Sequence, residues 1–165
     1  MKKQGFAPIV NENSTVLILG TIPSLESLRK QERYGHKYNQ FWKILFTLFG
    51  KPLPDNYSEK NALLIENNIA IWDVLDSCEG EGSLDSNIRN EKPNDFETFF
   101  KEYPRIKHIF FTGQKAAQLY KKHIGFNSDK TYTTLPSPSP ANARMTLEKK
   151  TEEWKVILQA VKNQQ

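Results

Sequence analysis

Residues 16–24 read Val-Leu-Ile-Leu-Gly-Thr-Ile-Pro-Ser, four apolar residues followed by a glycine and, three positions later, a proline. The short length of the apolar run and its β-branched residues favour a buried strand over a helix. Gly20 permits close approach of the backbone, and Pro23 fixes the direction in which the chain leaves. The stretch predicts a strand that ends in a tight turn. Taken alone, the turn is equally well an ordinary strand-to-helix connection.

Further apolar runs alternate with segments of helical periodicity. Strands are predicted at 69–74, 106–112 and 131–135, and helices at 41–48, 61–66, 96–103, 114–122 and 146–162. This alternation is typical of βαβ units, in which a parallel sheet is covered on both faces. We therefore predict an α/β fold with a central, mainly parallel four-stranded sheet. Ligands of such sheets bind beyond the carboxyl ends of the strands, where the loops at 20–24, 34–42 and 135–143 are expected.

The composition indicates one soluble domain spanning residues 1–165. Apolar residues make up 38% and charged residues 25%, without low-complexity runs, so extensive disorder is not expected. No apolar stretch is long enough to cross a bilayer, and no signal-type segment follows the first residues, so we expect a cytoplasmic protein with no membrane partner. Cys78 is the only cysteine and the three histidines are scattered, so no metal site is predicted.

Basic residues are concentrated towards the carboxyl terminus. Residues 101–165 hold 12 Lys and Arg against 5 Asp and Glu, whereas residues 1–100 hold 11 against 14. A basic third in a chain of pI about 9.1 is compatible with a polyanionic partner. Lysines on solvated helices explain the same excess, so charge alone leaves the partner open.

Residues 34–42 read Tyr-Gly-His-Lys-Tyr-Asn-Gln-Phe-Trp. Phe41 and Trp42 belong to the predicted helix and are expected in the core. Asn39 suits either a helix N-cap or a functional amide, and Tyr34 beside a glycine can offer a flat face to a base. His36 is more typical of a surface or capping residue than of a catalyst.

Residues 135–143 read Leu-Pro-Ser-Pro-Ser-Pro-Ala-Asn-Ala. Such a stretch is usually a linker or a recognition ligand, but here it lies inside the domain, between a predicted strand and a helix. Its small hydroxyl side chains can approach a phosphate backbone closely. Arg144, Lys149 and Lys150 follow it and either pair with phosphates or are solvated helix charges. The polar segment 82–89 either completes a pocket rim or only turns the chain.

Together these segments resemble the uracil-DNA glycosylase superfamily, and most closely its hypoxanthine-DNA glycosylase family. The resemblance extends in order over roughly residues 15–158. It is carried by Gly-Thr-x-Pro at 20–23, Tyr-Gly-His-x-x-Asn-x-Phe-Trp at 34–42, Ile-Trp-Asp-Val-Leu at 71–75, Gly-Ser-Leu-Asp-Ser-x-Ile at 82–88, Phe-x-Gly-x-Lys-Ala at 111–116 and Leu-Pro-Ser-x-Ser-Pro-Ala-Asn-Ala at 135–143. Each is weak alone, and six in order are fairly specific.

The resemblance implies a three-layer α/β/α sandwich that draws a damaged base out of DNA into a pocket. It also implies a monofunctional glycosylase without a cofactor, which uses water to cleave the N-glycosidic bond through an oxocarbenium-like state. Its partner would be damaged DNA, and a monomer is the simplest form of such an enzyme. Hypoxanthine is the base expected first, and uracil is the alternative.

The resemblance also implies roles for single residues. Better-known relatives orient the water with Asp or Asn in the first loop, where this chain has Ile22, so the task would pass to Asn39 as the catalytic residue. Tyr34 aligns with the aromatic that stacks on the flipped base. The remaining implied positions are base contacts at Gly20, Thr21, Ile22, Pro23 and Asp73, and DNA contacts at Ser137, Pro138, Ser139, Pro140, Ala141, Asn142 and Arg144.

The last loop departs from the pattern of many relatives. Leu135 stands where they carry the histidine that stabilises the leaving base, and Ser139 where they carry a leucine wedge. Thr112 stands where Asn is common, and Pro138 where Thr is common. The last two departures would alter base preference. Ile22 in place of the first-loop carboxylate and Leu135 in place of the last-loop histidine favour a second hypothesis, a nucleic-acid-binding domain of the same fold without catalysis, whereas Asn39 argues against it. A third, a metal-dependent nucleotide hydrolase using Asp73, Asp76 and Asp85, is not supported by any metal-site spacing.

Overall fold

The centre of the protein is a four-stranded parallel sheet, as the sequence predicts. The computed structural model describes residues 2–80 and 88–163. The sheet has the order β3-β2-β6-β7, with β2 at Val16–Gly20, β3 at Ile69–Asp73, β6 at His108–Thr112 and β7 at Thr131–Leu135. Every neighbouring pair is parallel. Right-handed crossover connections through helices are what such pairs require.

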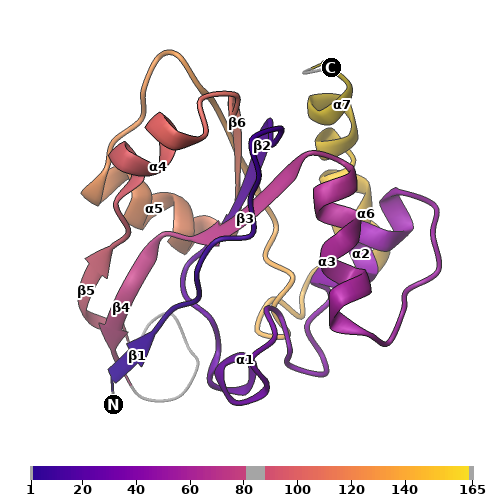
Figure 1. The fold of residues 1–165 in the computed structure, drawn as a ribbon. Helices are drawn as coiled ribbons and strands as arrows, with labels where there is room; N and C mark the ends of the chain where they lie inside the picture. The colour runs from indigo at the N-terminus through magenta and orange to yellow at the C-terminus, as the bar shows by residue number, and fades with distance from the viewer. Residues whose placement is uncertain (1, 81–87, 164–165) are drawn as a thin grey trace.

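Helices cover both faces of the sheet and make three layers (Figure 1). One face carries α2 (Phe41–Leu48), α3 (Tyr57–Glu66), α6 (Leu147–Trp154) and α7 (Val156–Asn163), and the other carries α4 (Phe96–Glu102) and α5 (Gln114–His123). Alternate residues of β2 enter the two cores, because strand side chains point to opposite faces: Val16 and Ile18 on the first, Leu17 and Leu19 on the second. The predicted three-layer sandwich is confirmed.

A second, antiparallel sheet was not predicted. It has the order β1-β4-β5, formed by Lys2–Gln4, Leu75–Glu79 and Arg89–Pro93. Its strands are short, and β5 is polar and largely exposed, so it has no apolar periodicity to signal a strand. Residues 82–87 of the polar segment 82–89 lie outside the described residues.

Helix boundaries differ from the prediction in two places. The single helix predicted at 146–162 is two helices, α6 and α7, separated at Lys155. Helix α3 begins earlier than predicted, because the Asn56 side chain accepts a hydrogen bond from the Glu59 N–H and caps it. Among the described residues, no helix is long and apolar enough to cross a membrane.

All four parallel strands end at the same edge of the sheet. Gly20 pairs with Asp73 at the ends of β2 and β3, and Thr112 pairs with Leu135 at the ends of β6 and β7. The short helix α1 (Leu25–Lys30) and the loop after β7 lie at this edge (Figure 1). The expected meeting place of the predicted loops is therefore confirmed.

Candidate active site

A cavity of about 710 Å³ opens at the carboxyl edge of the sheet. This is within the usual size of small-ligand pockets. It is lined by nearly all of the residues that the sequence singles out: Gly20, Thr21, Ile22, Pro23, Tyr34, Asn39, Asp73 and the segment 137–142. Arg144 is the exception, since it is exposed and does not line the cavity. The structure thus brings the three predicted loops together.

The deepest part of the cavity, which we call the floor, is formed by Gly20, Arg33, Tyr34, Asp73 and Thr112. Three side-chain oxygens converge on the space beside the Gly20 Cα. A Cβ built there would lie 2.9 Å from Asp73 Oδ1, 3.0 Å from Tyr34 Oη and 3.4 Å from Thr112 Oγ1. Glycine is therefore required at position 20, because any side chain would collide with these oxygens.

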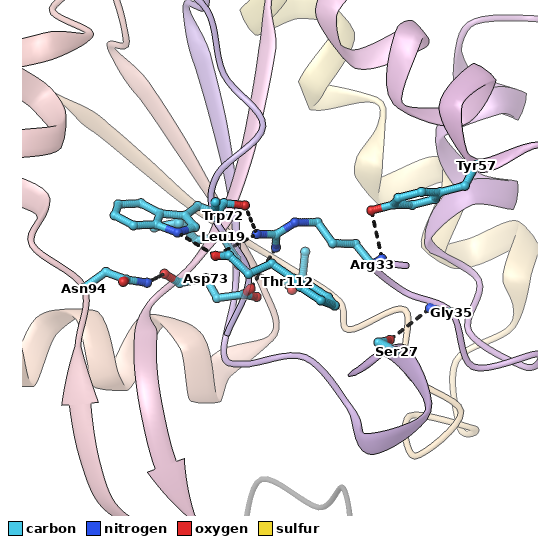
Figure 2. A network of polar contacts seen from close by, with 11 residues as sticks. Leu19, Ser27, Arg33, Gly35, Tyr57, Trp72, Asp73, Asn94 and Thr112 are labelled. Atoms are coloured by element: carbon cyan, nitrogen blue, oxygen red, sulfur yellow. Dashed lines mark hydrogen bonds and ion pairs between the residues drawn. The ribbon is translucent and has the colours of Figure 1, made fainter. Parts of the chain in front are cut away.

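Arg33 and Asp73 form a buried ion pair in the floor (Figure 2). Arg33 Nη1 donates to Asp73 Oδ2 at 2.7 Å, and the two side chains are 3% and 6% exposed. Arg33 Nη2 donates to the carbonyls of Phe6 and Ala7 at 3.4 and 2.9 Å. Loss of solvation raises the pKa of Asp73, and the charge and hydrogen bond of Arg33 oppose that rise. Such a pair tolerates no loss of one partner, since a lone buried charge is costly.

The backbone around Arg33 is fixed by side chains from two helices. The Arg33 N–H donates to Tyr57 Oη at 2.9 Å, and Trp42 Nε1 donates to the Arg33 carbonyl at 3.0 Å. Gly35 N–H donates to Ser27 Oγ at 3.0 Å, which ties the following turn to α1 (Figure 2). These contacts hold the segment that carries Tyr34.

Tyr34 has a backbone conformation that is unusual for a bulky residue, with φ of 56°. One face of its ring stacks on Phe41 with centroids 3.8 Å apart and planes 10° apart, so only the other face is available to a base. Its hydroxyl is enclosed and has no hydrogen-bond partner within the described residues. Burial raises the pKa of Tyr34 well above its usual range, and the nearby charge of Asp73 raises it further. The phenol is therefore neutral. The Thr112 hydroxyl beside it opposes that rise in pKa.

Asn39 lies in a tight turn ahead of α2. Its Oδ1 accepts a hydrogen bond from the Phe41 N–H at 2.9 Å, and its own N–H donates to the His36 carbonyl at 2.9 Å. The N-cap position itself belongs to Gln40, which makes no side-chain cap bond. An amide oxygen has two lone pairs, so Oδ1 retains one acceptor site while the Phe41 bond fixes its direction.

The segment 137–142, which we call the rim loop, is held by short local bonds. Ser137 Oγ accepts from the Ser139 N–H, and Ser139 Oγ accepts from the Ala141 N–H, both at 3.1 Å. Asn142 Nδ2 donates to the Ser137 carbonyl at 3.2 Å. Serine hydroxyls commonly close such turns onto the backbone two residues on. The loop therefore presents small side chains and polar backbone at the mouth of the cavity.

A buried lysine joins the rim loop to the turn that carries Asn39. The Gln40 N–H donates to the Pro138 carbonyl at 3.0 Å, and Lys150 Nζ donates to Gln40 Oε1 at 2.8 Å. Lys150 is only 2% exposed, and loss of solvation lowers its pKa from 10.5. Lys150 is therefore neither a phosphate contact nor a solvated helix charge, the two alternatives that the sequence leaves open.

Sequence reasoning missed Arg33, Ser27 and the role of Gln40. No pattern marks an arginine as buried, because its partner Asp73 is 40 positions away. Gln40 adjoins Asn39 but shows its link to the rim loop only once the chain is folded. Among the described residues, no three His, Cys, Asp or Glu side chains gather where they could hold a metal ion.

The chain is similar to known proteins in both sequence and structure. The model of the uracil DNA glycosylase superfamily matches residues 7–162. A hypoxanthine DNA glycosylase of Methanosarcina acetivorans is 37% identical over 158 residues, 95% of this chain and 98% of the relative. One of Methanosarcina barkeri is 39% identical over 119 residues, 72% of this chain and 75% of the relative. The solution NMR structure of a candidate uracil DNA glycosylase from Methanosarcina acetivorans superposes with a TM-score of 0.82 at 36% identity, covering 98% of this chain and 99% of that one.

Proposed function

The chain belongs to the uracil DNA glycosylase superfamily and is a DNA glycosylase, a hydrolase of N-glycosyl bonds, and we propose that its substrate is a flipped deaminated base, hypoxanthine in preference to uracil. The observation that carries this proposal is the cavity at the carboxyl edge of the sheet, whose lining brings Asp73, Tyr34 and Thr112 together beside Gly20. We propose that the enzyme is monofunctional and acts in base excision repair.

The floor suits the edge that deamination creates. Hypoxanthine and uracil each present an N–H beside a carbonyl, where adenine and cytosine present a bare ring nitrogen beside an amino group. An ionised Asp73 accepts from an N–H but repels a bare ring nitrogen, and the Tyr34 and Thr112 hydroxyls can donate to a carbonyl. Buried groups left unpaired by the wrong base give strong discrimination. This chemistry supports a deaminated base as the ligand.

Asn39 is proposed to position the attacking water. The water oxygen forms a bond to C1′ while the bond from C1′ to N9 breaks, the bonding pair leaves with the base, and the released proton ends on that base. Because an amide is a poor base, Asn39 acts by orientation, with its free acceptor site directed at the water. The Phe41 N–H at 2.9 Å supplies the rigidity that such orientation requires.

A nucleic-acid-binding domain without catalysis is the second candidate. It is favoured by the use of Asn39 Oδ1 in a local turn, which any structural asparagine can make, and by Ile22, whose side chain cannot bind a water at the position where other relatives carry Asp or Asn. The two candidates differ in a single observable, cleavage of the glycosidic bond.

A single-turnover alkaline-cleavage assay decides between them. Oligonucleotides carry deoxyinosine, deoxyuridine or no lesion, and the reaction contains a chelator. We expect deoxyinosine to be cleaved fastest and Asn39→Ala to lower its rate about 10²- to 10³-fold, the usual effect of removing one positioned polar group. Asn127→Ala, an exposed asparagine remote from the cavity, is the matched control and should leave the rate unchanged.

Asn39→Ser separates orientation from turn formation. A serine hydroxyl can close the same kind of turn onto the N–H two residues on, so the Phe41 bond persists, but the amide oxygen that would face the water is lost. If Asn39 only closes the turn, Asn39→Ser will retain the wild-type rate. Binding of lesion DNA by the wild type without any cleavage would instead support the binding domain.

A further inference from the structure

Tyr38 is an exposed aromatic residue that lies in the chain between two residues of the cavity lining. With 63% of its surface exposed, it is the most exposed large apolar side chain in the described part of the chain. His36 and Asn39, on either side of it, both line the cavity. Leu53, Phe126 and Val156 are the other exposed large apolar side chains among the described residues, and none of them lines the cavity or adjoins a residue that does. Singly exposed apolar side chains are common on protein surfaces, so it is the position of Tyr38 beside the cavity that distinguishes it from the others.

Local contacts present the Tyr38 ring outward. The Tyr38 N–H donates to His36 Nδ1 at 3.2 Å, and the two rings are 5.8 Å apart. Lys37 Nζ lies 4.8 Å from the centre of the Tyr38 ring, within the range of a cation–π contact. Phosphates would offer the Lys37 ammonium a stronger partner, which would release the ring for another contact.

Base extrusion leaves a gap in the base stack that an aromatic ring beside the cavity can fill. Taking a nucleotide out of a duplex leaves a gap in the stack, and proteins that distort DNA commonly fill such gaps with an inserted side chain. The opposite side of the cavity mouth does not supply one, because the rim loop contains only serine, proline, alanine and asparagine. A planar ring stacks on any base, whatever its identity.

We propose that Tyr38 enters the duplex at the position vacated by the flipped nucleotide, while Lys37 transfers from the Tyr38 ring to a neighbouring phosphate. This inference rests on the proposed function, since it presupposes that a base is extruded. It assigns to the turn before α2 two tasks on adjacent residues. Asn39 faces the reacting sugar, and Tyr38 faces the stack.

The first test compares duplex and single-stranded deoxyinosine substrates under single-turnover conditions, with wild type, Tyr38→Ala, Tyr38→Trp and Phe126→Ala. Phe126 is an exposed aromatic remote from the cavity and serves as the matched control. Loss of one stacking contact should slow Tyr38→Ala on the duplex between about 5- and 150-fold. The same variant should be unchanged on the single strand, which has no stack to hold open. Tyr38→Trp should retain the duplex rate.

The second test uses fluorescence to detect insertion of the Tyr38 ring into the duplex. 2-Aminopurine is placed beside the deoxyinosine in a duplex, and its fluorescence is measured on binding. Extrusion of its neighbour unstacks the reporter, and an inserted ring quenches it again, so Tyr38→Ala should give a brighter complex than wild type. Phe126→Ala should match wild type.

The outcomes separate this inference from the proposed function. Equal fluorescence of the wild-type and Tyr38→Ala complexes, or equal slowing of Tyr38→Ala on duplex and single strand, would overturn the role of Tyr38 while leaving the glycosylase intact. Failure of the wild type to cleave deoxyinosine in either form would overturn the proposed substrate whatever Tyr38 does.

Discussion

The floor of the cavity is held by a buried ion pair and long side chains, whereas the rim loop is held by short bonds between small residues and the nearby backbone. Arg33 and Asp73 are both almost fully enclosed and come from segments 40 residues apart. Ser137, Ser139 and Asn142 bond within their own six-residue segment. Both regions line the same cavity, but a buried ion pair stabilises the floor and local hydrogen bonds stabilise the rim loop.

This difference indicates a division of labour. A buried charge pair is strongly coupled to the fold, because removing either partner leaves an uncompensated charge. The turns of the rim loop are closed mainly by their own local bonds, with the Pro138 carbonyl accepting from the Gln40 N–H, and they present polar backbone at the mouth of the cavity. We therefore expect floor substitutions to change stability and base selection together, and substitutions at the DNA-facing edge to change DNA affinity alone.

Arg33→Met gives the largest expected effect. It removes the partner of Asp73 without removing the burial of the carboxylate, and breaking a buried pair in this way costs about 3–5 kcal/mol of unfolding free energy. Urea unfolding at neutral pH measures the loss. The double variant Arg33→Met with Asp73→Leu should recover part of it, since no lone charge then remains.

Arg29→Met is the control for Arg33→Met. Arg29 pairs with Glu26 on the surface, with its side chain 72% exposed, and an exposed pair contributes only about 0–1 kcal/mol. An equal loss in the two variants would mean that the floor does not depend on buried charge, and the contrast drawn between the two regions would fail.

Gly20→Ala is expected to act on activity more than on stability. The new Cβ would lie 2.9 Å from Asp73 Oδ1 and 3.0 Å from Tyr34 Oη, so these side chains must shift and the floor changes shape. A shift of about 1 Å at a reacting site can lower kcat/KM by about 10²-fold. Cleavage of deoxyinosine and urea unfolding are measured on the same preparation.

Gly125→Ala separates pocket filling from backbone strain. Gly125 has a φ of 89°, where alanine is strained, but no atom lies within 4 Å of the position of its Cβ. We expect this variant to lose stability and keep kcat/KM. If Gly125→Ala and Gly20→Ala lose activity in proportion to their stability, the oxygens beside Gly20 have no special role.

The sequence predicted the rim better than the floor, and the reason is physical. Strand β2, its turn and the rim loop are set by neighbours in the chain, so their residues indicate them directly. The parallel sheet then brings the ends of its strands together whatever the side chains are. For that reason the meeting of the loops at 20–24, 34–42 and 135–143 could be predicted from the strand pattern, whereas the single lining residues at 20–23, 34, 39, 73 and 137–142 were implied by the family resemblance.

The floor contacts needed the folded chain. Arg33 is one of 23 Lys and Arg residues, and nothing in its neighbours distinguishes a buried guanidinium from a solvated one. The same holds for Lys150, which precedes Thr151 in a charged, amphipathic helix and yet is 2% exposed. The antiparallel strand β5 was missed because its polar residues have no alternation to read.

Lys150→Met tests whether a buried lysine also supports the rim loop, to which Lys150 is connected through Gln40. At neutral pH the variant leaves Gln40 Oε1 without its donor, and we expect a loss of about 1 kcal/mol. The pH dependence gives a second signature. Burial lowers the pKa of Lys150 in the folded state below its unfolded value of 10.5, so the charged form opposes folding.

Deprotonation of Lys150 stabilises the folded state. Below the folded-state pKa of Lys150 the wild type carries the full desolvation cost, and as pH rises towards 10.5 the cost is relieved and the stability increases. Lys150→Met lacks this increase. Urea unfolding at about pH 7 and about pH 10 compares the two proteins. A pH dependence identical in both would show that Lys150 is charged in the folded and unfolded states alike across this range.

Arg144→Ala has the smallest expected effect and tests the outer edge of the rim. Arg144 is exposed and lies beyond the cavity, so its removal should not change kcat or stability. If it contacts one phosphate, duplex affinity should fall a few-fold, and the slope of log K against log salt should become shallower by about 1. Lys162→Ala, which removes the same charge from exposed α7, is the control. Equal slopes for Arg144→Ala and Lys162→Ala would mean that Arg144 acts only through net charge, and that the DNA path ends at the rim loop itself.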